Sequence, residues 1–73
     1  MPRIFTLHKL QQDAELRSEL RDTREFNVIV LSTEPHLTTR QWLIDHEIPA
    51  AQIYSGPDIH SLADQACEEW ELS

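Results

Sequence analysis

The chain has 73 residues, with six lysines and arginines against 13 aspartates and glutamates, so its formal net charge is −7. This length predicts a single domain over residues 1–73, near the lower limit for a fold without covalent staples. The lone cysteine, Cys67, excludes a disulfide framework, a thiolate zinc site and a CxxC redox pair.

The hydropathy pattern predicts no membrane span. The longest continuous apolar stretch runs from Val28 to Leu31, far short of the about 20 residues that cross a bilayer. A signal peptide has an apolar run followed by a cleavage site of small residues, and the first residues of this chain have no such pattern. We therefore expect a cytoplasmic protein that does not bind membranes.

Charge is unevenly distributed along the chain. Residues 1–24 have a balance of +1, whereas residues 41–73 contain seven carboxylates and no lysine or arginine. This asymmetry argues against direct nucleic-acid binding, which needs cations to displace counterions. It suits a protein partner with a basic surface. The alternative is that the acidic residues only keep a small protein soluble.

The N-terminal half predicts a strand, a helix and a second strand. Residues 4–7 form a short apolar run with β-formers, and good helix formers extend from about His8 to Arg21. Asp13 could instead be an N-cap that divides this segment into a loop and a shorter helix. Residues 25–32 are apolar on both faces, which is typical of a buried parallel strand.

The C-terminal half predicts a helix, a strand and a last helix. Thr38 with Gln41 fits a capping box, and Leu37 with Trp42 fits a hydrophobic staple, for a helix that stops before Pro49. A start at 33–34 with a proline in the first turn is the competing interpretation. Residues 51–54 predict a strand, and 55–58 a turn that opens the last helix. In that helix an apolar stripe has helical spacing: Ile59, Leu62, Ala63, Ala66 and Trp70.

This order predicts an α/β fold, a small three-layer βαβαβα unit with a three-stranded parallel sheet. The strand order stays open. A sheet face without a helix would have to be covered by a partner, so a homodimer is one interpretation.

The predicted strand ends carry candidate site residues. In open parallel sheets ligands bind beyond the carboxyl ends of the strands. Ser32 and Thr33 follow the second strand and could bind phosphate at a helix N-terminus, or could be ordinary helix caps. His8, His36 and Glu34 could meet there as a metal site or a general base, although the histidines have no metal-ligand spacing and surface positions are the alternative.

The middle of the chain resembles the second-motif region of haloacid dehalogenase-like (HAD-like) phosphatases. The resemblance lies in VIVLSTEP (28–35), TTRQWL (38–43) and HEIP (46–49), and it implies a hydroxyl role for Ser32 or Thr33. The family's nucleophilic Asp-x-Asp has no counterpart after the first strand, where Thr6 to Lys9 stand, and Lys9 is the only lysine. The resemblance therefore implies a degenerate or truncated relative without phosphoryl transfer.

Cys67 and the two tryptophans are further candidate residues, and Cys67 and Trp70 have two interpretations each. Cys67 has an apolar helical context beside an acidic neighbour, which favours a core position over a nucleophile. Trp42 and Trp70 either anchor the core or, for Trp70, project as an interface residue.

The sequence therefore predicts a non-enzymatic regulatory or inhibitory module that binds a basic or nucleic-acid-binding surface of another protein. It predicts no catalytic residue, metal or cofactor. Its partner-binding residues would be Asp64, Glu68, Glu69, Trp70 and Glu71. The alternatives are a vestigial HAD-like phosphate-binding domain and a structural homodimer subunit.

Overall fold

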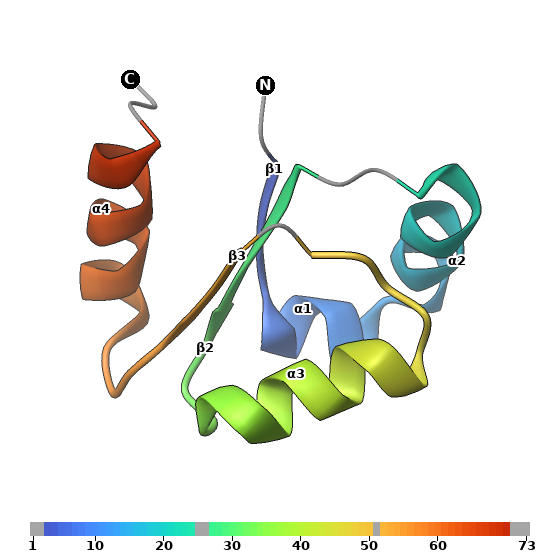
Figure 1. The fold of residues 1–73 in the computed structure, drawn as a ribbon, viewed down its shortest axis with the longest axis horizontal. Coiled ribbons are helices and arrows are strands. Elements are labelled where there is room, and N and C mark those ends of the chain that lie inside the picture. The colour runs from blue at the N-terminus through green and yellow to red at the C-terminus, as the bar shows by residue number, and fades with distance from the viewer. Residues whose placement is uncertain (1–2, 25–26, 51, 71–73) are drawn as a thin grey trace.

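The computed structural model describes residues 3–24, 27–50 and 52–70, which form a parallel sheet with helices on both faces (Figure 1). Its strands are β1 (Arg3–Thr6), β2 (Val28–Ser32) and β3 (Gln52–Ser55), in the order β1-β2-β3. The predicted three-stranded parallel α/β fold is confirmed, and the strand order that the sequence left open places β2 in the centre.

The centre of the core is β2, because side chains on both of its faces are buried. Val28 and Val30 belong to one apolar cluster, and Ile29 and Leu31 belong to the other. Successive side chains of a strand point to opposite faces, so one short β-branched run supplies both layers of packing.

Three helices cover one face of the sheet and one helix covers the other (Figure 1). Helices α1 (Leu7–Gln12), α2 (Ala14–Thr23) and α3 (His36–Asp45) lie in the two crossovers, which step in the same direction across the sheet. Right-handed crossovers that step in one direction place their helices on the same face. The last helix, α4 (Ile59–Glu69), follows β3 and packs on the opposite face.

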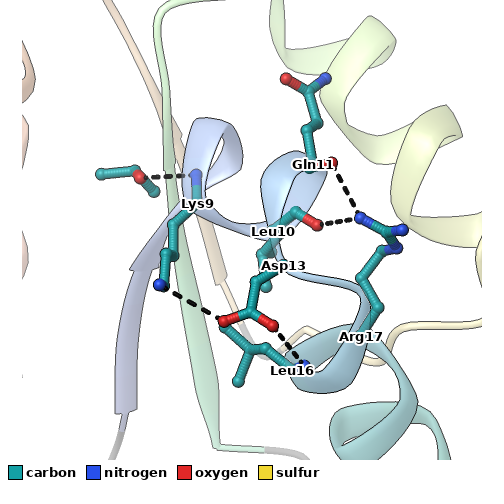
Figure 2. Close-up of polar contacts among 7 residues, drawn as sticks. Lys9, Leu10, Gln11, Asp13, Leu16 and Arg17 are labelled. Atoms are coloured by element: carbon teal, nitrogen blue, oxygen red, sulfur yellow. Dashed lines mark hydrogen bonds and ion pairs between the residues drawn. The ribbon is translucent and has the colours of Figure 1, made fainter.

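The prediction of one continuous helix from His8 to Arg21 is wrong. Asp13 ends α1 and is the N-cap of α2, where its Oδ1 accepts a hydrogen bond from the Leu16 backbone N–H over 3.0 Å (Figure 2). The alternative that Asp13 is an N-cap is therefore correct. The residues before it form a helix rather than a loop, because Thr6 caps them by accepting from the Lys9 N–H over 3.1 Å.

The predicted capping box of Thr38 and Gln41 and the staple of Leu37 and Trp42 are wrong. The N-cap of α3 is Pro35, with φ −56° and no side-chain cap hydrogen bond, so the helix starts earlier than the box required. The Leu37 side chain is 73% exposed and makes no staple. The fixed φ of proline suits a helix entry and explains this start.

The other boundaries lie close to the predicted ones. Helix α3 ends at Asp45, ahead of Pro49, and Asp58 opens α4 by accepting from the His60 N–H over 3.0 Å. Glu25, Phe26 and Ala51, which belonged to the predicted strands, lie outside the described residues. None of the helices in the described parts of the chain has the length and apolar character that crossing a membrane requires.

Candidate functional site

The outward side of α4 forms an exposed acidic face. Its core-facing side chains, Leu62 and Ala66, are buried against β2 and β3, which turns the opposite side to solvent. Four exposed polar residues follow helical spacing there: Ser61, Asp64, Gln65 and Glu68. These four residues are called the acidic face of α4 below.

The two carboxylates of this face have no neutralising partner among the described residues. No hydrogen bond or ion pair to a described residue involves the side chain of Asp64 or Glu68. The ion pairs within the described residues all lie in the N-terminal part of the chain: Arg3–Glu19, Lys9–Asp13 and Arg21–Asp22. The charge asymmetry of the sequence is therefore also present in the fold.

Glu69 and Trp70 form a polar cluster with Tyr54 at the end of α4. The Tyr54 hydroxyl donates to Glu69 Oε2, and Trp70 Nε1 donates to the Tyr54 hydroxyl over 3.1 Å. Burial, followed by the hydrogen bond to Glu69, raises the pKa of Tyr54 above its usual value. The Trp70 side chain is 38% exposed, so it both packs and faces solvent. Glu71 lies outside the described residues.

The part played by Tyr54 was not predicted. It comes from β3, so the contact with α4 spans 15 residues of sequence and depends on tertiary packing. One sequence feature could have pointed to this contact, namely a tyrosine at the end of a strand that precedes an amphipathic helix. A buried tyrosine hydroxyl usually has a hydrogen-bond partner, and the following helix could supply one.

Asp45 and Glu47 are not part of the acidic face. They line a polar pocket of about 330 Å³ together with Arg17 and Arg21 of α2. The acidic stretch from residue 45 onward is therefore divided in three dimensions, with one part beside arginines and the other on α4. The sequence, in which seven carboxylates share residues 41–73, does not show this division.

The Ser32 side chain is a buried hydrogen-bond acceptor at the end of β2. Its Oγ accepts from the Glu34 backbone N–H over 2.9 Å and from Thr39 Oγ1 over 2.7 Å. Thr39 also donates to the Pro35 carbonyl oxygen, so this network fixes the turn into α3. Thr33 is exposed beside it. Ser32 is not the cap of α3, because the N-cap is Pro35 and makes no side-chain cap hydrogen bond. Phosphate binding by Ser32 and Thr33 stays a prediction.

The structure brings only part of the predicted histidine cluster together. His8 and Glu34 line one pocket at the carboxyl edge of the sheet, whereas His36 lines a different pocket beside β3. No group of three or more histidine, cysteine, aspartate or glutamate side chains within the described residues could hold a metal ion.

The two remaining candidate side chains, Cys67 and Trp42, are half-buried. Cys67 is half-buried on α4. Trp42 is half-buried and packs against the core, and its ring stacks on that of His46 with centroids 4.0 Å apart.

Comparison of the chain with protein-family models, with curated proteins and with solved structures found no match.

Proposed function

We propose that this chain is a non-enzymatic protein-binding module that places the acidic face of α4 against a basic surface of another protein. The observation that carries the proposal is the pair Asp64 and Glu68, which are exposed on the same side of one helix and have no partner among the described residues. Charges of this kind raise the rate of association with an oppositely charged surface.

The acidic face costs stability in the free protein. Asp64 and Glu68 are four residues apart, so their like charges repel across one helical turn. Glu68 also lies in the last turn of α4, where the helix dipole disfavours a negative charge. A cationic partner would remove both costs, which gives such a partner a free-energy gain beyond the direct contacts.

Trp70 adds an apolar anchor beside the acidic face. Its indole N–H is satisfied by the Tyr54 hydroxyl, and its ring is partly exposed. A side chain that is already fixed loses little conformational entropy on binding. Tryptophan is also enriched among the residues that dominate interface energies.

The arginines of α2 lie away from the acidic face. Arg17 and Arg21 belong to α2, which packs on the opposite face of the sheet from α4 (Figure 1). A cationic partner that approaches α4 therefore meets carboxylates before it meets like charge. This separation supports docking through α4 rather than through the surface as a whole.

A pair of matched variants tests the proposal. Asp64→Asn/Glu68→Gln and Glu15→Gln/Glu47→Gln each remove two negative charges from exposed positions, and only the first pair lies on the acidic face. With an oligolysine peptide as probe, we expect the α4 variant to weaken binding about five- to tenfold and the control to change it by less than about twofold. Equal losses in both variants would show that only net charge matters and would refute the proposal.

A further inference from the structure

We propose that the pocket between the carboxyl ends of β1 and β2 binds a small organic cation with a flat aromatic body. The pocket has a volume of about 380 Å³, and residues of β1, α1, β2, the following loop and α4 line it. This volume lies within the range of known small-molecule sites, about 300–1,000 Å³. The inference is independent of docking through α4, because the acidic face of α4 takes no part in this pocket.

The fold explains why a hollow remains at this place. Within the described residues, three helices pack on one face of the sheet and α4 alone packs on the other. The main contacts of α4 are with β2 and β3. Ile4 and Thr6 of β1 remain half-buried on the side of α4. The corner between β1 and the first turn of α4 is therefore open, at the strand ends where parallel sheets bind ligands.

The inner wall of the pocket is apolar. Leu7 and Leu31 are almost fully buried, with 4% and 3% of their surface exposed, and Ile59 from the first turn of α4 closes the opposite side. These three aliphatic side chains favour a flat hydrocarbon surface, because burial of apolar area drives such binding.

The rim of the pocket provides free polar side chains. His8, Gln11, Thr33 and Glu34 are exposed there, and their side chains have no hydrogen bond or ion pair to a described residue. The Ser32 hydroxyl, in contrast, is already engaged by two donors. The rim can therefore orient a ligand without breaking an existing contact.

The charge of the rim selects a cation. Among the described residues that line the pocket, Glu34 is the only carboxylate and none is a lysine or arginine. Its carboxylate is an acceptor that can bind an amidinium or ammonium group in a charge-assisted hydrogen bond. The same charge repels an anion, so a phosphate or a carboxylate ligand is disfavoured at this position.

Benzamidine and benzoate test the inference, because the two molecules share a ring and differ in the sign of their charge. With the isotope-labelled full chain, we expect benzamidine to shift the backbone amide signals of His8, Thr33 and Glu34, and benzoate to leave them unchanged. Glu34→Gln should weaken benzamidine binding about tenfold, and Glu15→Gln, which alters the net charge equally, should change it by less than about twofold.

The opposite outcomes would overturn the inference. Equal shifts with benzoate or with inorganic phosphate would show an anion site or no selectivity. Equal losses in Glu34→Gln and Glu15→Gln would show general attraction to an acidic protein. Asp64→Asn/Glu68→Gln should leave benzamidine binding unchanged, which separates failure of this inference from failure of docking through α4.

Discussion

Arg17 donates a hydrogen bond from Nη1 to the carbonyl oxygen of Leu10 over 2.7 Å, and the same atom donates to the Gln11 carbonyl oxygen over 2.8 Å (Figure 2). Both carbonyls lie in the last turn of α1, where carbonyl oxygens have no backbone N–H of the same helix to accept from. A helix of six residues is too short to be stable alone. One guanidinium of α2 therefore holds α1 in place.

Removal of this guanidinium should destabilise the domain. We expect Arg17→Met to lower the free energy of unfolding by about 1–2 kcal/mol, because two carbonyls lose a charged donor. Arg21→Met is the matched control, since the hydrogen bonds of the Arg21 side chain to described residues join only Ser18 and Asp22 at the surface, and it should cost less than about 0.5 kcal/mol. Urea denaturation measures both, and equal losses would contradict a special role for Arg17.

The sequence predicted the architecture well because its strongest patterns are local. The run from Val28 to Leu31 is apolar on both sides, which predicts a buried parallel strand, and the stripe of α4 has one unambiguous helical period. The division between α1 and α2 was left as an alternative, because residues on both sides of Asp13 are good helix formers and only the Asp13 cap separates them.

The candidate sites were less predictable because they depend on contacts between distant segments. Thr38 was predicted as a cap, yet it is the neighbouring Thr39 that turns inward to Ser32. The separation of Asp45 from the acidic face depends on how the end of α3 meets α2, which no local pattern shows. The exposed carboxylates of α4 were predictable, since the amphipathic period alone assigns its outward residues.

The two aspartate helix caps should give the protein an acid-sensitive component of stability. Backbone hydrogen bonds, from Leu16 to Asp13 and from His60 to Asp58, are the main cause that lowers the pKa of each carboxyl below its usual value. A carboxyl whose pKa is lower in the folded state stabilises the fold above the unfolded pKa, about 3.9, and this contribution is lost as the pH falls through the folded pKa.

Asp13→Asn/Asp58→Asn tests this component, because asparagine keeps a cap acceptor and removes the charge. We expect the variant to unfold at lower urea concentration than the wild type at neutral pH, and the difference to shrink below pH about 4. Asp64→Asn, at a position without a cap role, is the control. A difference that stays constant down to strong acid would contradict the assignment.

Tyr54 should limit stability on the alkaline side. Its pKa is raised mainly by burial, so the fold favours the neutral phenol. That preference stabilises the protein fully below the unfolded pKa, about 10, and is lost as the pH rises through the higher folded pKa. Tyr54 is the only tyrosine, so its absorbance reports this ionisation alone.

In an alkaline titration, tyrosinate should form above pH about 10 and together with loss of the fold. Tyr54→Phe should remove the link between alkaline pH and loss of the fold. Because Trp70 Nε1 also loses its acceptor in this variant, we expect Trp70 to be more exposed, which a red shift of tryptophan fluorescence would show. Ionisation at the usual value while the fold stays intact would contradict the buried placement of the hydroxyl.

Ser32 should matter for stability rather than for phosphate. We expect Ser32→Ala to cost about 1–3 kcal/mol, because the Glu34 N–H loses its acceptor and the Thr39 hydroxyl loses one of its two acceptors. Thr33→Ala, at an exposed neighbour, should change stability by less than about 0.5 kcal/mol. Phosphate with magnesium should leave the amide signals of both residues unshifted. A specific shift there would instead support the phosphate-binding prediction.

The acidic face of α4 should be stabilised by the same substitutions that weaken its binding. In Asp64→Asn/Glu68→Gln the repulsion across one helical turn disappears and the last turn loses a charge that opposes the dipole, so we expect a gain of about 0.5–1 kcal/mol at low salt. High salt should shrink this gain, because exposed charges are screened. Glu15→Gln/Glu47→Gln should show no such gain, since Glu15 lies in the first turn of α2, where the dipole favours a negative charge. If neutralising Asp64 and Glu68 instead lowered stability, their carboxylates would have partners within the molecule, and the acidic face would no longer offer unpaired charge to a basic protein.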